Sequence, residues 1–488
     1  MNISNAQISS EIIVNANIIM FFGKKMLPLL QIEAFMTTFE SKKALTLNEI
    51  DQAVRFNEPI GPDHPFYTDF SEVRGDFEER IVYRILNVDC SNSQFKFNPG
   101  VNSGNKTLFF LGGMRGSGKT SELAKYAGKL NRPDCFFCVT CNIDEELDMN
   151  DVEYMDILIF QLEKLTDRLK QEDVKVDDGI LQKMQRWFEQ REQEIKKSMA
   201  GEIGLEFGGG LKKDGLLSQL LAIFGELKMK VTGTREWAET IRKTLRNRFP
   251  DFAGIFNDYI QEVNIALRKE GKAQEVLFIV DGLEKTLSAD MRRKIILDES
   301  NRLSKIKAYT IFTLPIELMR ERQKIMQFST IESFPFVKLF ERNGDENAKS
   351  FDKFFEFVYK RVDEKLFESS KLVKDLIRLS GGSPRELLRI LETSTFYADE
   401  KNGIINRQAF DKAAIRLANQ TAQYLTEEEI EKLKEIRDNN KKGKDTTFDD
   451  TIQGLLENII IMEYNDGTYK RANPIVELSN IYKQRIGD

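Results

Sequence analysis

The stretch that decides the fold runs from Thr107-Leu-Phe-Phe-Leu111 into Gly113-Met-Arg-Gly-Ser-Gly-Lys-Thr120. The first part is apolar, as expected of a buried strand, and the second matches the pattern G-x-x-x-x-G-K-[ST] at every fixed position. A helical pattern then extends from Thr120 to Leu130. A strand, a glycine-rich turn and a helix in this order predict a phosphate-binding loop, the P-loop.

The residue types in this loop suit a triphosphate. Glycines let backbone N–H groups turn inward around phosphate oxygens, where a Cβ would clash. Lys119 is expected to reach the β and γ phosphates and to act in catalysis, and the Thr120 hydroxyl is placed to coordinate Mg²⁺. The residues expected to bind ATP here are Gly113, Met114, Arg115, Gly116, Ser117, Gly118, Lys119, Thr120 and Ser121.

A second, acidic element is expected at the carboxyl end of a neighbouring buried strand, where it holds the metal's water shell. The continuously apolar run Val276–Val280 is typical of a central parallel strand and leads into Asp281. We expect Asp281 to share Mg²⁺ with Thr120, and Glu284 to orient and deprotonate the attacking water. The alternatives are a turn residue beside Gly282 for Asp281 and a helix-start acid for Glu284.

Two more residues are candidate sensors of the γ-phosphate. Thr313 stands near the end of the apolar strand predicted at 308–314. In Gly381-Gly-Ser-Pro-Arg-Glu386 the proline begins a helix, and Arg385 falls in its first turn, where an acid is favoured. Such local conflicts are typical of functional positions. The alternative for Arg385 is a surface arginine paired with a nearby glutamate.

Strands that alternate with helices around these motifs predict an α/β fold with a parallel sheet, a P-loop NTPase core. The core is expected at residues 70–345, after an N-terminal segment at 1–69. It contains a largely helical insertion at about 165–270, in which Gly201–Gly210 is a candidate hairpin.

The C-terminal third is expected to hold two further units. Amphipathic helices predict a helical lid at 346–424. Helices followed by apolar runs around the turn Asn465–Gly467 predict a winged-helix-like domain at 425–488.

The bulk composition bears on the possible partners. A net charge of −6 gives no whole-protein footprint for nucleic acid, so DNA binding is neither implied nor excluded. The apolar run Glu11–Phe22 is too short to span a bilayer, so we expect a cytoplasmic protein without a membrane partner. Cys135, Cys138 and Cys141 follow one another at a spacing of three on an expected strand, which sends neighbouring thiols to opposite faces and disfavours a metal cluster.

Taken together, the motifs resemble those of the AAA+ and STAND branch of P-loop ATPases, including archaeal-type, origin-recognition and KAP-like ATPases of prokaryotic defence systems. The likeness extends from about Phe70 to the C-terminus. Gly382-Ser-Pro-Arg385 is similar to the sensor-two positions of the family's lid. Phe70–Glu79 resembles a loose form of the box near the adenine, with Arg74 in an inverted order. Asp281-Gly-Leu-Glu284 departs from the adjacent Asp-Glu of standard members and is closer to the STAND and KAP pattern.

The resemblance implies a homo-oligomer in which one subunit supplies an arginine finger to the next. The candidate fingers are Arg302, Arg320 and Arg322. Because no second catalytic constellation is visible, the first hypothesis is an ATP-dependent switch that controls a separately encoded effector protein, as in antiphage defence.

The alternative is a DNA-associated ATPase of the origin-recognition or transposition-targeting type, which binds duplex DNA through its winged helix. Such a helix presents lysines and arginines to phosphates. The basic residues that flank the expected helix and wing are Lys441, Lys442, Lys444, Lys470 and Arg471. The acidic total charge counts against this alternative.

Overall fold

The computed structural model describes residues 42–89, 95–98, 107–198, 215–286, 288–398, 401–464 and 469–487. Contacts divide the chain into residues 1–41 and one unit from Lys42 to Asp488, and all the described helices and strands belong to the second unit. Three features expected from the sequence lie outside the described residues: the apolar run at 11–22, the candidate hairpin at 201–210 and the turn at 465–467.

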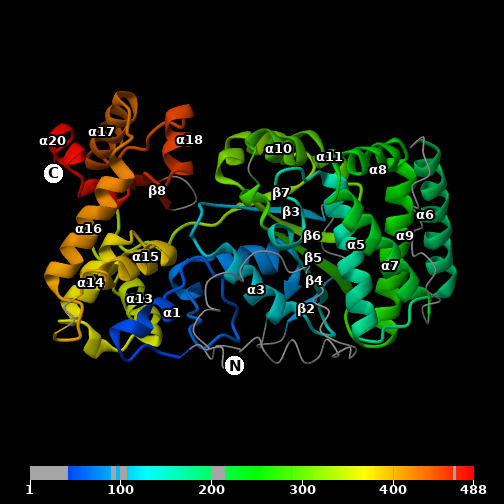
Figure 1. Ribbon diagram of the computed structural model, residues 1–488, viewed down its shortest axis with the longest axis horizontal. Helices are drawn as coiled ribbons and strands as arrows, with labels where there is room; N and C mark the ends of the chain where they lie inside the picture. Colours follow the sequence, from blue (N-terminus) through cyan, green and yellow to red (C-terminus); the bar gives the residue numbers. More distant parts are fainter. Residues whose placement is uncertain are drawn as a thin grey trace, which may run out of the picture. The chain divides into compact units, whose positions relative to one another are not determined.

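A five-stranded parallel sheet forms the centre of the core, with the strand order β4-β5-β6-β3-β7 (Figure 1). Its strands are β3 (Leu108–Gly112), β4 (Phe136–Asn142), β5 (Glu275–Asp281), β6 (Tyr309–Leu314) and β7 (Thr330–Ser333). Because every pairing is parallel, the carboxyl ends of all these strands lie along one edge. The predicted α/β fold with a parallel sheet is confirmed.

The expectation that the acidic strand directly neighbours the P-loop strand is wrong. Strand β6 lies between β3 and β5, with Leu111 opposite Thr313 on one side and Phe312 opposite Val280 on the other. Both β5 and β6 are buried along almost their whole length, so the burial expected from their sequences gives no information about their order. The inserted strand brings Thr313 between the P-loop and Asp281.

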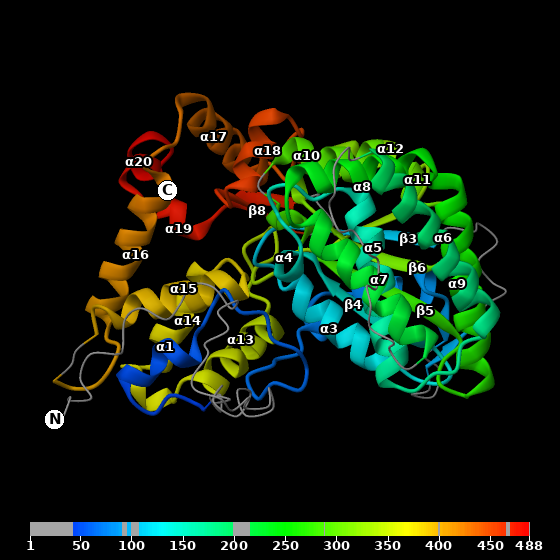
Figure 2. The same ribbon diagram turned by 45° about the vertical axis from the view of Figure 1, so that its right-hand side comes forward.

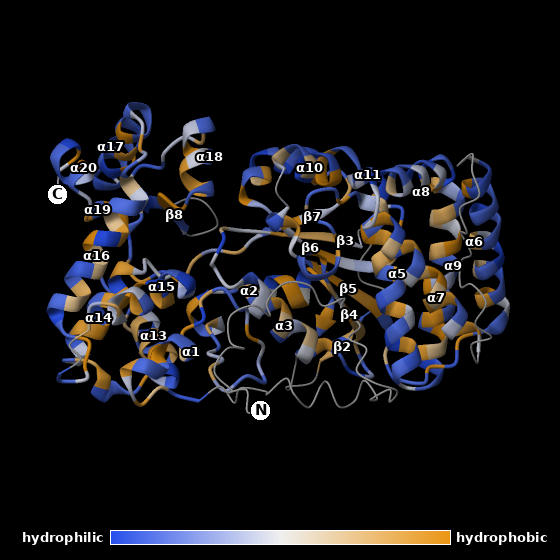
Figure 3. Cartoon of the chain, in the orientation of Figure 1, coloured by the Kyte–Doolittle hydropathy of each residue, from blue (hydrophilic) through white to orange (hydrophobic). Residues whose placement is uncertain are grey.

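Side chains alternate across the sheet and separate two apolar layers. Phe109 and Leu111 pack on one face with Leu123 and Tyr126 of α3 (Lys119–Leu130). The opposite face packs against the helical insertion. Figure 3 shows hydrophobic residues concentrated along the strands, with hydrophilic residues on the outer turns of the helices.

The cysteines follow the same alternation. Cys138 belongs to the α3 layer and Cys141 to the opposite one. Within the described residues, no group of histidine, cysteine and acidic side chains is arranged to hold a metal by itself. Nor does that part of the chain contain a helix of the length and apolarity needed to cross a membrane.

The insertion is a bundle of helices gathered beside the sheet (Figures 1 and 2). Its members are α5 (Tyr154–Gln171), α6 (Asp178–Ser198), α7 (Leu216–Val231), α8 (Arg235–Asn247) and α9 (Phe249–Lys269). A buried ion pair joins α8 to α5, with Arg242 Nη2 at 2.6 Å from Asp156 Oδ2. Both side chains are almost fully buried, so the pair fixes these helices in one register.

Short elements connect the core strands. They are α4 (Ile143–Glu146), η7 (Leu283–Lys285), α10 (Ala289–Arg293), η8 (Lys294–Asp298), α11 (Ser300–Leu303), η9 (Ile316–Glu321) and α12 (Arg322–Ile325). Before β3 lie η3 (Leu47–Glu49), α1 (Ile50–Ala53), η4 (Ser71–Val73), α2 (Phe77–Glu79), η5 (Arg80–Ile85), β1 (Val88–Asp89) and β2 (Lys96–Phe97).

The lid helices are α13 (Ala348–Arg361), α14 (Ser370–Leu379), α15 (Pro384–Thr395) and α16 (Arg407–Ala422), with η10 (Glu364–Leu366) after α13. Their apolar faces share one hydrophobic cluster with Ala44, Ile50, Val54, Phe66 and Phe70. Part of the segment before the core is therefore packed on the lid.

The C-terminal elements are α17 (Glu427–Lys441), α18 (Asp450–Glu457), β8 (Ile461–Tyr464), β9 (Tyr469–Ala472), α19 (Pro474–Glu477) and α20 (Asn480–Arg485). The strands β8 and β9 pair antiparallel, as the hairpin prediction required. Assignment of these elements as a winged helix stays a prediction. Their hydrophobic cluster includes Met114 of the P-loop and Ile316 after β6.

Substitution of Gly382, in the turn before α15, tests whether the lid packs closely against the segment that contains Val337. Gly382 has φ +85°, and an added Cβ would lie 1.8 Å from the Val337 carbonyl oxygen. Gly403, at φ +65°, has open space at that position. We expect Gly403→Ala to cost about 1–2 kcal/mol of backbone strain. Gly382→Ala should cost about 1–3 kcal/mol more because of the clash, measured by thermal unfolding. Equal losses for the two variants would contradict the close approach.

Candidate functional site

The P-loop forms a tight turn between β3 and α3. Gly116 and Gly118 adopt φ of +82° and +96°, which favour glycine, and Gly118 caps α3. The buried Lys119 side chain folds back over the turn, so that Nζ donates to the carbonyl oxygens of Gly113 at 2.9 Å and Met114 at 3.0 Å. The loop therefore has the backbone shape of an anion-binding nest with a buried ammonium inside it.

Asp281 ends β5 beside the loop and is only 6% exposed. Burial and the neighbouring Glu284 raise its pKa, whereas the hydroxyls of Thr120 and Thr313 and the Lys119 ammonium oppose that rise. Its Oδ1 is buried and has no hydrogen-bond partner in the described chain. A carboxylate oxygen left without a donor fits a hydrated cation, and oxygen ligands are those that Mg²⁺ prefers.

Thr313 connects the two acids of the site. Its Oγ1 donates to Glu284 Oε2 at 2.8 Å and accepts from the Gly282 backbone N–H at 3.3 Å. The Thr313 side chain is completely buried. The hydroxyl therefore fixes one oxygen of Glu284, which η7 carries just after Asp281, and leaves the other oxygen for a further donor.

Several charges meet at the loop. Burial lowers the pKa of Lys119, the carboxylates of Glu284 and Asp281 act in the opposite direction, and Arg385 and Arg115 lower it further. Burial and Arg115 also lower the pKa of Arg385. Cations that disfavour one another in this way are stabilised together by a polyanion.

The lid touches the P-loop through the turn before α15. Ser383 Oγ donates to the Gly116 carbonyl oxygen at 3.2 Å, and Arg385 Nε donates to the Phe56 carbonyl oxygen at 3.3 Å. A Cβ on Gly116 would come within 3.0 Å of Arg385 Cβ. Arg385 thus lies where the sequence predicted, at the second position of α15 and against the loop.

The predicted residues Arg115, Gly116, Gly118, Lys119, Thr120, Ser121, Glu284 and Arg385 line one pocket. Gly113, Met114 and Ser117 do not line the pocket but belong to hydrogen bonds within the loop: the Gly113 and Met114 carbonyl oxygens accept from Lys119, and that of Met114 also accepts from the Ser117 hydroxyl. Asp281 and Thr313 do not line it either, but Asp281 acts to raise the pKa of Lys119, and Thr313 donates to Glu284. Sequence reasoning missed the rest of the wall, which consists of Phe56, Asn57, Glu58, Pro59, Ile60, Lys285, Phe357, Arg361, Pro384 and Leu388.

Residues 56–60 belong to the expected N-terminal segment at 1–69, and their types carry no chemical signal. Arg361 does carry one. It falls on the apolar face of α13 with Phe354, Phe357 and Val358, where an arginine is out of place.

Arg74, which the resemblance set near the adenine, does not line this pocket. Its Nη2 donates to the Ser117 carbonyl oxygen at 2.6 Å, and its guanidinium lies 4.1 Å from the centre of the Phe334 ring. Burial lowers the pKa of Arg74 to about 10. Arg74 therefore binds the P-loop backbone at Ser117, outside the pocket.

The candidate arginine fingers lie outside the pocket. Arg302 pairs with Glu299 at 2.7 Å, and Arg320 pairs with Asp450 on α18. Arg322 begins α12 and is exposed. Their role toward a second subunit stays a prediction.

The basic residues near the expected wing divide into two groups. Lys441, Lys442 and Lys444 are exposed. Lys470 is buried with Nζ at 3.3 Å from Glu463, and Arg471 pairs with Glu477 at 3.1 Å. The second group is therefore not directed at an outside phosphate.

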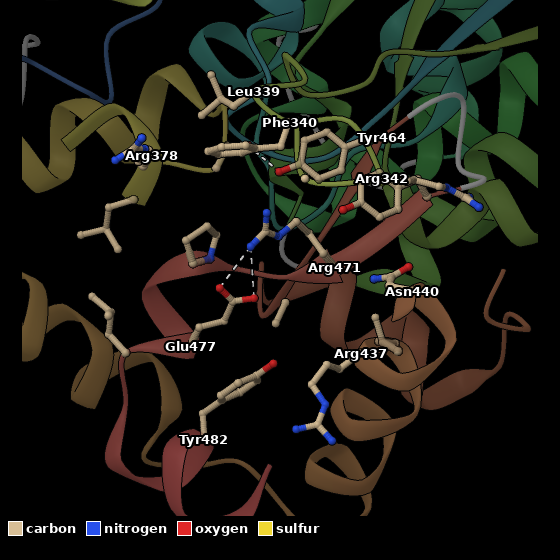
Figure 4. Close-up of a pocket in the computed structure, with 18 of the residues that line it drawn as sticks. Leu339, Phe340, Arg342, Arg378, Arg437, Asn440, Tyr464, Arg471, Glu477 and Tyr482 are labelled. Carbon is tan, nitrogen blue, oxygen red and sulfur yellow. Dashed lines mark hydrogen bonds and ion pairs between the residues drawn. The ribbon is translucent and has the colours of Figure 1, made fainter. Parts of the chain in front are cut away.

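A larger cavity, of about 650 Å³ against about 130 Å³ at the P-loop, lies among α14, the loop at 339–344 and the C-terminal elements (Figure 4). Figure 4 shows Arg471 and Glu477 pointing toward each other inside it. Arg378, which also lines it, pairs with Asp375 at 3.1 Å. Because these charges neutralise one another, we assign the ligand site to the smaller pocket, where the buried Asp281 oxygen has no donor among the described residues.

No family model matches the sequence, and no curated protein matches it. Among solved structures, the chain is similar to the Walker-type ATPase of Pyrococcus abyssi at 13% sequence identity and a TM-score of 0.40. That match covers 87% of this chain and 98% of the other. A likeness this weak contributes nothing to the assignment of the site, which rests on its own geometry.

Thr313 allows a direct test of that geometry. Thr313→Val keeps the shape of the side chain but leaves the buried Gly282 N–H and one oxygen of the partly buried Glu284 without their partner. We expect a loss of about 1–3 kcal/mol in thermal unfolding, because unsatisfied buried polar groups are costly. Thr313→Ser retains the hydroxyl and should lose clearly less. If valine and serine variants are equally stable, Thr313 does not hold Glu284.

Proposed function

We propose that this chain binds ATP at the P-loop and hydrolyses it with Mg²⁺, and that the lid responds to the bound nucleotide. The observation that carries the proposal is the buried Lys119 ammonium inside a glycine turn, with Asp281 and Glu284 on its far side. No other described pocket combines an anion nest with two acids at a strand end.

Triphosphate binding gives the buried charge of Lys119 a full counterion. Its Nζ now uses two main-chain carbonyls, which are neutral acceptors. Phosphate oxygens in their place make charge-assisted hydrogen bonds, which are roughly twice as strong. The positive N-terminal end of α3 and the nearby Arg115 and Arg385 act in the same direction.

Thr120 and Asp281 are the residues that would hold Mg²⁺, the first by its hydroxyl and the second through the Oδ1 that no described donor reaches. The metal would supply positive charge for the β and γ phosphates. With few protein ligands, it would keep most of its coordination for water and phosphate.

Glu284 is proposed as the general base. Thr313 fixes one of its carboxylate oxygens, so the other has a defined direction in which to accept a proton from water. A base oriented by a third group is a recurrent arrangement in hydrolytic sites. The neighbouring Glu284 carboxylate helps to raise the pKa of Asp281, so the two acids lie close together at this strand end.

The switch part of the proposal is supported by the lid contacts. Ser383 and Arg385 touch Gly116, so occupation of the loop changes the surroundings of the turn that begins α15. Met114 lies in the C-terminal hydrophobic cluster, which gives the same loop a second connection. Oligomer assembly and control of a partner effector belong to this proposal and are tested by mass with and without a slowly hydrolysed ATP analogue.

Lys119→Ala is the decisive binding test. Removing an ammonium that pairs with phosphates should weaken ATP affinity by about 10- to 100-fold, measured by calorimetry. Lys129→Ala is the matched control, because Lys129 lies on the same helix but pairs with Glu78 outside the pocket. Affinity unchanged by Lys119→Ala would refute the proposed site.

Glu284→Gln separates binding from hydrolysis. The amide keeps the size of the side chain and its contact with Thr313 but cannot take a proton. We expect ATP affinity to be retained and turnover to fall by about 100- to 10,000-fold, in steady-state phosphate release. Turnover at the unmodified rate would exclude Glu284 as the base.

A further inference from the structure

Arg361 is a buried cation for which the described residues supply no anionic partner. It ends α13, is 3% exposed and lines the P-loop pocket. Its guanidinium lies 3.8 Å from the centre of the Phe357 ring and 5.4 Å from that of Phe66, and Nη1 donates to the Phe357 carbonyl oxygen at 2.9 Å. Aromatic faces and a main-chain carbonyl therefore surround a full positive charge.

Such an arrangement is unfavourable without a ligand. The free energy needed to remove a cation from water exceeds what contacts with aromatic faces and one carbonyl oxygen supply. Buried arginines are therefore normally paired with an anion. Burial lowers the pKa of Arg361 to about 9, and no carboxylate of the described chain counteracts this. The buried charge of Arg361 therefore destabilises the free protein, and an apolar side chain would fill the same space without that cost.

Arg361 also lies apart from the phosphate-binding charges. Arg361 lines the same pocket as Lys119, Arg115 and Arg385, but it does so from the end of α13 in the lid. Lid residues and residues 56–60 form much of the pocket wall outside the P-loop. Arg361 thus belongs to the lid wall of the pocket and not to the P-loop that is proposed to hold the phosphates.

We propose that Arg361 recognises the nucleoside part of the nucleotide, donating hydrogen bonds to acceptor atoms of the base or the ribose. This rests on the proposed function and adds a specificity-determining residue to it. A guanidinium offers only donors, so the matching atoms are ring nitrogens or carbonyl oxygens of a base, or ribose oxygens. The bound nucleoside replaces the missing partner of the buried charge.

The test compares ATP with inorganic tripolyphosphate, which has no nucleoside, using the full chain. Arg361→Met should weaken ATP affinity by about 10- to 100-fold and leave tripolyphosphate affinity unchanged. Because methionine suits the Phe66 and Phe357 surroundings, its melting temperature without ligand should equal or exceed that of the unmodified protein. Arg361→Lys keeps the charge without the fork and should lose less ATP affinity. Arg416→Met, at an exposed arginine of α16, is the control.

The outcomes are distinct. Equal loss for ATP and tripolyphosphate, or no loss for either, overturns the role of Arg361. If the unmodified chain binds neither ligand, the proposed function fails and this inference fails with it. 2′-Deoxy-ATP locates the contact further: if Arg361 donates to the ribose 2′-oxygen, the unmodified chain binds 2′-deoxy-ATP as weakly as Arg361→Met binds ATP, whereas a contact elsewhere on the nucleoside leaves its affinity close to that of ATP.

Discussion

The site depends on one buried ammonium. Lys119 lies inside the turn made by its own loop, where solvent cannot stabilise its charge, and two main-chain carbonyls accept its hydrogen bonds. Two acids and two arginines near the loop act on that charge. Asp281 and Glu284 stabilise it, whereas Arg115 and Arg385 make the loop still more receptive to an anion. A buried cation surrounded in this way acts as a preorganised binding group, since it needs no rearrangement of water when phosphate arrives.

The parallel sheet supplies the second constraint. Parallel strands bring their carboxyl ends to one edge, so the residues that follow β3, β5 and β6 meet there despite large separations in sequence. Because β6 is the strand between the other two, Thr313 can reach Glu284 and the Gly282 backbone at once. The same hydroxyl therefore supports both the acid and the turn that carries it.

The lid gives the pocket its other wall and connects it to the rest of the chain. The turn before α15 touches Gly116, and the hydroxyl of Tyr464 on β8 donates to the Gly381 carbonyl oxygen one residue before Gly382. The lid turn is thus held from two sides, by the P-loop and by the C-terminal hairpin. Met114 belongs to the hydrophobic cluster of that hairpin. A conformational change in the P-loop would therefore reach the C-terminal elements directly through Met114, and through the lid turn by way of Tyr464.

Sequence by itself determined the parts of the site that are local. The P-loop is contiguous, its glycines and Lys119 act within eight residues, and Asp281 is recognisable because it ends a continuously apolar strand. Only the tertiary structure decided the strand order, the arrival of residues 56–60 and Arg361 at the pocket, the burial of Lys470 and the pairing of Arg471 with Glu477. Periodicity in a sequence indicates which face of a helix or strand is buried, but not what it is buried against. Those partners are chosen by packing between segments far apart in the chain, and that packing has no local signature.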